Sequence, residues 1–332
     1  MQKLFSWLLE EENPSLRYLA MRNLKALGTS PAQLAIAKKR AHREGKIPQI
    51  LDKMESEGYW VKPGAGYTPK YLSGVWSLLL LAQLGASVEE DPRIKTAMEY
   101  YTEQAFTQFG KISWNGSPYG SFDCLQGNMV YALLSLGMPS ARLAEQIDWL
   151  ARSQTGEGIA SSADKKASVR YGSGKCGPAF ACTYNYGNPC AWGAIRAVMG
   201  LTRLPESERT AMAKEAIAMA VNFLLQASPE HPVWPGDKTM SSHWHKFTFP
   251  LFYMSDLLHI AEALAAAGAL SHEKASPLLT YILSKRNPDG SWNLEYSSQS
   301  VGGSFGRSGK PNKWVTLRVL RVLEAANLSD EQ

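Results

Sequence analysis

Long helical segments of two kinds alternate along the chain. One kind is nearly all apolar, and the pattern predicts it at about residues 14–27, 69–85, 123–137, 189–203, 250–267 and 312–326. The other kind is amphipathic and is predicted at about residues 90–108, 140–153, 205–227 and 271–285, with a further helix starting at Ser30-Pro31. A helix that is apolar on every side must be buried on every side, and an amphipathic helix can cover it. The pattern therefore predicts an all-α protein, an (α/α)6 toroid of helical hairpins.

A short loop that contains Gly, and in most cases Trp, precedes most of the apolar helices. These loops recur about every 50 to 60 residues, a period that is typical of repeat architectures, and they hold Gly58-Tyr59-Trp60, Trp114-Asn115-Gly116, Gly158, Trp234-Pro235-Gly236 and Gly290-Ser291-Trp292. Because every irregular stretch precedes an inner helix, the long loops are expected at one mouth of the barrel. Long loops in a compact domain are usually functional. No linker divides the chain, so we expect one domain over residues 1–332.

Composition narrows the class of protein. The chain has a mean hydropathy of −0.24 and a net charge of +5 from 35 basic and 30 acidic residues. No apolar run reaches the length of about 18 residues that a membrane helix needs. No cluster of basic and aromatic residues favours nucleic acid. The apolar start over residues 1–11 is too short for a signal peptide. These observations predict a cytoplasmic protein with reduced cysteines, and they leave its oligomeric state open.

The loops before the inner helices carry a recognisable element. The segment Ile282–Trp292 follows the pattern Leu-x3-Gln-x3-Gly-x-Trp with Arg286 in place of Gln, Ile50–Trp60 follows it with Met54 there, and Leu150–Gly158 keeps Gln154 without the Trp. In this element the chain resembles the α/α toroids of the squalene–hopene cyclase and prenyltransferase class. The resemblance implies a toroid and an isoprenoid or other apolar substrate. The Asp-x-Asp-Asp and Asp-Asp-x-x-Asp acid motifs of terpene cyclases are absent from the sequence.

Four cysteines fall where loops meet inner helices: Cys124, Cys176, Cys182 and Cys190. Thiolates that converge at one mouth suit zinc, or less well an iron–sulfur cluster, and His243 is a candidate fourth or additional ligand. Buried cysteines also serve as small apolar packing groups. A catalytic or redox thiol is the third interpretation. In this respect the chain is similar to bacterial linalool dehydratase–isomerase, an α/α toroid with a functional Cys pair in a comparable loop.

The candidate acids and bases are Asp123, Asp256 and His245. Both Asp residues lie in otherwise apolar inner helices, and burial raises the pKa of a carboxyl group, so that it can donate a proton to an alkene or alcohol. Three alternatives stay open: Asp123 caps its helix, Asp256 and His259 form a polar pair in the core, and the histidines at 243 and 245 lie in a surface loop without function. Two carboxylates across a barrel would also suit a carbohydrate-active hydrolase or lyase.

Aromatic residues crowd the expected mouth, and five of them are predicted to bind substrate: Trp114, Tyr184, Trp244, Phe249 and Tyr253. Aromatic faces stabilise carbocations. The favoured interpretation is an enzyme that acts on a small apolar molecule by cyclisation, isomerisation, dehydration or prenyl transfer. One alternative is the carbohydrate-active enzyme. The other is a non-catalytic scaffold, stabilised by metal, that binds a ligand or a protein.

Overall fold

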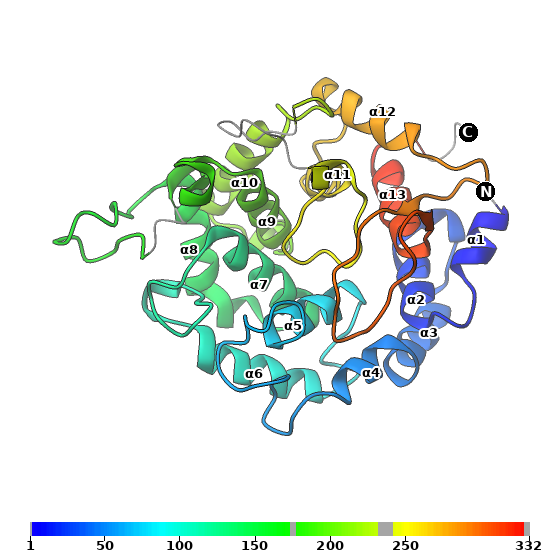
Figure 1. Ribbon diagram of the computed structural model, residues 1–332, viewed down its shortest axis with the longest axis horizontal. Helices are drawn as coiled ribbons and strands as arrows, with labels where there is room; N and C mark the ends of the chain where they lie inside the picture. The colour runs from blue at the N-terminus through cyan, green and yellow to red at the C-terminus, as the bar shows by residue number, and fades with distance from the viewer. Residues whose placement is uncertain (1, 173–176, 232–241, 329–332) are drawn as a thin grey trace.

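The protein is mainly helical. The computed structural model describes residues 2–172, 177–231 and 242–328. Six helices lie nearest the middle of the view in Figure 1: α2 (Pro14–Asn23), α5 (Gly74–Gln83), α7 (Asp123–Leu136), α9 (Ala191–Leu201), α11 (Leu257–Ala266) and α13 (Lys313–Ala325). Those toward its periphery are α1 (Gln2–Leu8), α3 (Pro31–Arg43), α4 (Lys46–Leu51), α6 (Arg93–Ala105), α8 (Ala144–Thr155), α10 (Ala211–Leu224) and α12 (Ser276–Ser284).

The strands are short and belong to loops. β1 (Ala181–Cys182) pairs antiparallel with β2 (Asn188–Pro189), and β3 (Asn293–Leu294) pairs antiparallel with β4 (Lys310–Pro311). Each pair is a two-residue ladder that closes a loop before the next helix. The prediction of a mainly α-helical chain is therefore confirmed. Within the described ranges, every helix is too short or too polar to cross a bilayer.

Helices that follow one another along the chain pack side by side. The central helices contact in the order α5, α7, α9, α11, α13 and α2. Each is also packed on a peripheral helix: α3 on α2, α6 on α5, α8 on α7, α10 on α9, α12 on α11 and α1 on α13. Figure 1 shows this succession as a curved arrangement around a centre. The closed toroid of six hairpins stays a prediction.

Burial follows the two kinds of sequence pattern. Every residue of α5 except Gln83 is buried. In α6 the buried residues form a single stripe with helical spacing: Ile94, Ala97, Met98, Tyr101 and Ala105. The central helices therefore supply the core, and the peripheral ones cover it with one face.

Some helices begin where the sequence predicts, and others begin several residues later. The α3 helix begins at Pro31, as expected, because Ser30 and Gln33 form a reciprocal capping box. The α11 helix was expected from residue 250 but begins at Leu257. Asp256 sets this start by accepting a hydrogen bond from the backbone N–H of His259 at 2.7 Å. Residues 249–256, here called the strap, are therefore not helical, and Figure 1 shows this yellow loop reaching into the middle of the arrangement.

The α5 helix also begins later than expected, at Gly74 rather than near residue 69. The helix cannot begin before Tyr71, because the backbone φ of Tyr71 is 69° and lies in the left-handed region, which a right-handed helix does not contain. The residues just before α5 are therefore loop, and their side chains are available to a site.

The Trp residues of the repeated element are structural. The indole N–H of Trp60 donates to the carbonyl of Ile50 at 2.9 Å, and that of Trp292 donates to the carbonyl of Ile282 at 2.8 Å. Each carbonyl lies in the last turn of a helix, where it has no partner within the helix. Both indoles are 1% exposed. The two loops thus make the same contact, as expected of a repeat.

Candidate functional site

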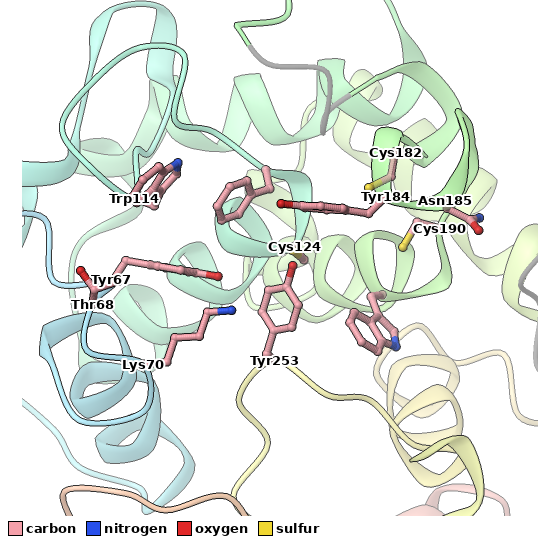
Figure 2. Close-up of a pocket in the computed structure, with 12 residues that line it drawn as sticks. Tyr67, Thr68, Lys70, Trp114, Cys124, Cys182, Tyr184, Asn185, Cys190 and Tyr253 are labelled. Atoms are coloured by element: carbon pink, nitrogen blue, oxygen red, sulfur yellow. The ribbon is translucent and has the colours of Figure 1, made fainter. Parts of the chain in front are cut away.

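A cavity of about 600 Å³ lies where four loops meet the central helices. Its walls come from the loops before α5, α7, α9 and α11 and from the first residues of α7 and α9: Tyr67, Thr68, Lys70, Trp114, Phe122, Cys124, Cys182, Tyr184, Asn185, Cys190, Trp192 and Tyr253. Figure 2 shows the rings of Tyr67, Tyr184 and Tyr253 directed toward a common space. Half of the lining residues are aromatic, and the lining contains no Asp or Glu among the residues described.

Short-range structure brings the cysteines to this cavity. Cys124 is the second residue of α7, and Cys190 is the residue just before α9. Cys182 ends β1, whose partner β2 runs directly into Cys190. All three are thiols and not disulfides. The predicted convergence of cysteines from two neighbouring helix starts therefore matches their placement, except that Cys176 lies outside the described residues.

One thiol is paired with a tyrosine of the strap. The Tyr253 hydroxyl donates a hydrogen bond to the sulfur of Cys124. Burial raises the pKa of the Cys124 thiol to about 11. The negative charge of a Cys124 thiolate and then burial also raise the pKa of Tyr253. At neutral pH both groups therefore keep their protons, and the pair can donate one.

The other two thiols form a second pair. A hydrogen bond to Cys182 and then burial raise the pKa of Cys190 well above its usual range. Figure 2 shows both sulfurs on the side of the cavity away from Lys70. The cavity thus has hydrogen-bonded proton-bearing groups on two sides.

Arg196 holds the strap that carries Tyr253. Its guanidinium is 1% exposed and donates to the carbonyls of Phe252 and Tyr253, each at 3.1 Å, and of Met254 at 3.3 Å. It also donates to Asn128 Oδ1 at 3.1 Å and to the Ser255 hydroxyl. Burial lowers the pKa of Arg196 to about 10, which still leaves it charged at neutral pH. No motif in the sequence marks Arg196 as a site residue, although a lone Arg within an apolar helix is a usable signal.

The described residues do not form a metal site on their own. No group of three or more His, Cys, Asp or Glu side chains is placed to hold a metal within residues 2–172, 177–231 and 242–328. His243 packs against the ring of Tyr296, with centroids 4.7 Å apart, and does not line the cavity. With Cys176 undescribed, zinc and iron–sulfur binding stay predictions from sequence.

Asp256 is occupied by structural contacts. Its two carboxylate oxygens accept from Arg318 at 3.1 Å each, and backbone N–H groups of Thr248 and His259 donate to it at 2.7 Å. It is fully buried and does not line the cavity. These contacts make Asp256 a helix-capping residue and a partner of Arg318, and its role as a proton donor stays a prediction.

The other two predicted catalytic residues also lie outside the lining. Asp123 is 4% exposed and is the first residue of α7, directly before Cys124, where a negative charge favours the helix start. His245 places its Nε2 at 2.7 Å from the carbonyl of Pro229 and its ring against Tyr281. A catalytic role for either residue stays a prediction.

The predicted aromatic residues divide into two groups. Trp114, Tyr184 and Tyr253 line the cavity. Trp244 is 1% exposed and lies behind Trp192. Phe249 stacks on Trp314 with centroids 4.7 Å apart and lines a separate central cavity of about 60 Å³. Trp244 and Phe249 are therefore core residues, which the sequence could not distinguish from wall residues.

Lys70 was not predicted. Its ammonium lies 5.4 Å from the ring centroid of Tyr67 and 5.0 Å from that of Tyr253, and Figure 2 shows it pointing into the cavity. Thr68 and Asn185 are the other non-aromatic lining residues that were not predicted. No sequence motif marks these three residues, because their place depends on how the loops fold over one another.

Comparisons with known proteins do not assign this chain to a family. No protein family model matches the chain, and no curated protein sequence matches it. Two solved structures have weak likenesses. A protein from Actinoplanes has a TM-score of 0.31 and 16% identity, over 88% of this chain and 99% of that one. A variant of the type II terpene cyclase MstE from Scytonema, in complex with geranylgeranyl dihydroxybenzoate, has a TM-score of 0.32 and 12% identity, over 94% and 99%. At such scores neither likeness establishes a shared fold or function.

Proposed function

We propose that this chain is an (α/α)6 toroid enzyme that acts on a mainly apolar, isoprenoid-like small molecule by proton transfer, in a dehydration, isomerisation or cyclisation. One observation carries the proposal. The walls of the 600 Å³ cavity are aromatic, and their polar groups include three thiols and the Tyr253 hydroxyl, with no carboxylate among the described lining residues.

The walls suit an apolar substrate that passes through a cationic state. Six aromatic side chains face the cavity: Tyr67, Trp114, Phe122, Tyr184, Trp192 and Tyr253. Their faces attract positive charge through the ring quadrupole, and the Lys70 ammonium over two of the rings illustrates this attraction. The volume lies within the range of about 300–1,000 Å³ that is usual for small-molecule sites.

The Tyr253–Cys124 pair suits general acid–base chemistry. In a dehydration, this pair gives a proton to the substrate hydroxyl, the C–O bond breaks and water leaves. The pair, now one proton short, takes a proton from the adjacent carbon of the cation, and the electrons of that C–H bond form the alkene. This step restores the pair. In an isomerisation the first proton goes to an alkene carbon instead, and no oxidant or reductant is needed in either case.

No observation favours the alternatives over this proposal. A glycosidase of the usual kind needs two carboxyl groups flanking the scissile bond, and the described lining has none. A pure scaffold would fill the mouth with its own loops, whereas these loops leave an open cavity.

The test is turnover of isoprenoid alcohols and alkenes of about 10 to 20 carbons, sizes that fit such a cavity. Incubation in deuterium oxide followed by gas chromatography and mass spectrometry detects both water loss and deuterium uptake. We expect Tyr253→Phe to lower the rate about 100-fold or more, as for the loss of a general acid. Tyr186→Phe is the matched control, because Tyr186 is 81% exposed and outside the lining. A Tyr253→Phe rate equal to that control, or no product and no cavity binding for the whole panel, contradicts the proposal.

A further inference from the structure

A second cavity, of about 350 Å³, lies at the other ends of the central helices. The aromatic cavity takes residues from the starts of α7 and α9. The second cavity takes Asn23 at the end of α2, Thr202 and Arg203 just after α9, and Arg321 near the end of α13. The 11 residues of α9 span about 16 Å, so the two cavities are separate sites.

The polar lining of this cavity consists mainly of donors. Arg203 and Arg321 contribute two guanidinium groups, and Glu262 contributes the one carboxylate. That carboxylate is already engaged, because Arg318 donates to its Oε2 through Nε at 3.0 Å and Nη2 at 2.7 Å. In the described part of the chain neither Arg203 nor Arg321 forms an ion pair with an acidic residue. The positive charge here is thus not balanced by the protein.

Arg321 has charged neighbours of both signs. Burial lowers the pKa of Arg321, the negative charge of Glu262 opposes this lowering, and the positive charges of Arg203 and Arg22 add to it. Arg203 is held in place by Tyr131, with its guanidinium 4.8 Å from the ring centroid and 3.4 Å from the hydroxyl. An anion between the guanidinium groups would relieve the repulsion.

Asn23 supplies an independent observation. Its side-chain Nδ2 is buried and has no hydrogen-bond partner, while its Oδ1 accepts from Arg22 Nε at 3.4 Å. A buried donor without an acceptor costs about 1–3 kcal/mol, and this one belongs to a residue that lines the cavity. The C-terminal ends of helices attract cations by themselves, which accounts for arginines here. It does not account for an unsatisfied amide donor beside an unfilled cavity.

We propose that this second cavity binds the oxyanion group, phosphate or carboxylate, of a small ligand. Arg203 and Arg321 supply charge-assisted donors, and Asn23 supplies a third, neutral one. Such hydrogen bonds are about twice as strong as neutral ones. The volume exceeds what a few water molecules occupy and lies within the range of small-molecule sites, about 300–1,000 Å³. This site is independent of the proposed chemistry in the aromatic cavity.

The test is titration calorimetry of the whole protein with inorganic phosphate and, separately, with succinate, at an ionic strength fixed by sodium chloride. We expect saturable binding of at least one probe, and the probe that binds identifies the group. Arg321→Gln and Arg203→Gln should each weaken binding about tenfold or more, as expected for a lost charge-assisted contact. Asn23→Asp, which keeps the shape but replaces the donor by a carboxylate, should abolish it.

The matched control is Arg307→Gln, which removes the same charge from an exposed loop outside this cavity. Circular dichroism melting checks that each variant is folded, and if one is not, the other two carry the test. Binding that is weakened in the three cavity variants but not in Arg307→Gln supports the site. No saturable binding of either probe, an equal effect of Arg307→Gln, or normal binding by Asn23→Asp overturns it.

Discussion

Replacing Arg196 by Met should destabilise the protein strongly. The buried guanidinium is the common partner of three successive strap carbonyls, those of residues 252, 253 and 254. It also binds the side chains of Asn128 and Ser255. Met is unbranched and apolar, is shorter than Arg and has no donor, so the variant leaves these buried acceptors unpaired.

The magnitude follows from these contacts. A hydrogen bond to a charged group contributes about 1.5–3 kcal/mol, and the contributions of neighbours in one network are not additive. Removing one partner from a buried charged network costs about 3–5 kcal/mol. We therefore expect the free energy of unfolding to fall by about 3–5 kcal/mol, a large part of the roughly 5–15 kcal/mol that a domain has.

Urea denaturation followed by circular dichroism measures this loss. Arg196→Lys should lie between the wild type and Arg196→Met, because one ammonium cannot reproduce the planar fork that reaches several acceptors. Arg307→Met is the control for the loss of charge alone. We expect it to change the free energy of unfolding by no more than about 0.5 kcal/mol, as ordinary surface substitutions do. If Arg196→Met loses less than about 1 kcal/mol, the size of a single neutral hydrogen bond, the network does not hold the strap as described.

Three further predictions concern other buried contacts. Asp256→Asn should cost about 3 kcal/mol in urea unfolding, since it leaves Arg318 with Glu262 as its one remaining acidic partner; a change below about 1 kcal/mol argues against the ion pair. Trp60→Phe and Trp292→Phe should each cost about 1 kcal/mol, the net contribution of one neutral hydrogen bond, because each helix-end carbonyl keeps a second donor in the backbone N–H of Lys53 or Lys285; clearly unequal costs would mean that the two contacts are not equivalent. Cys124, with its pKa raised to about 11 from 9.0, should react with iodoacetamide slowly at pH 8, and its rate, followed by peptide mass spectrometry, should keep rising up to about pH 11. A plateau near pH 9 would contradict the raised pKa.

The sequence predicted helices well where the cause of a helix is local. The α3 helix starts at the predicted residue because Ser30 and Gln33 form a capping box within four residues. The strap was predicted as helix because it is apolar, and apolar character alone does not separate a helix from a buried loop. Its conformation depends on Arg196, which is 56 residues away from Phe252. Contacts of that separation leave no periodic signal in the sequence.

In the candidate site too, some features depend on local sequence and could be predicted, whereas others depend on distant contacts and could not. The convergence of Cys124, Cys182 and Cys190 was predictable, because each lies at or near the start of one of two neighbouring helices. The role of Asp256 was not, because its partner Arg318 is 62 residues away. An acid in an apolar helix has the same appearance in sequence whether it is a proton donor or half of an ion pair. The hydrogen-bond donors of the second cavity could not be predicted from the sequence either, because they come from the ends of helices that are far apart in the chain.

The paired tryptophan contacts have a consequence for how the chain folds. Each indole joins a helix end to the loop 10 residues later, once near the N-terminus at Trp60 and once near the C-terminus at Trp292. A loop of about 10 residues closes in roughly 10–100 ns, and closing it needs no distant part of the chain. We therefore expect both contacts to form before the central helices assemble, so that folding starts from two small local nuclei at opposite ends of the sequence.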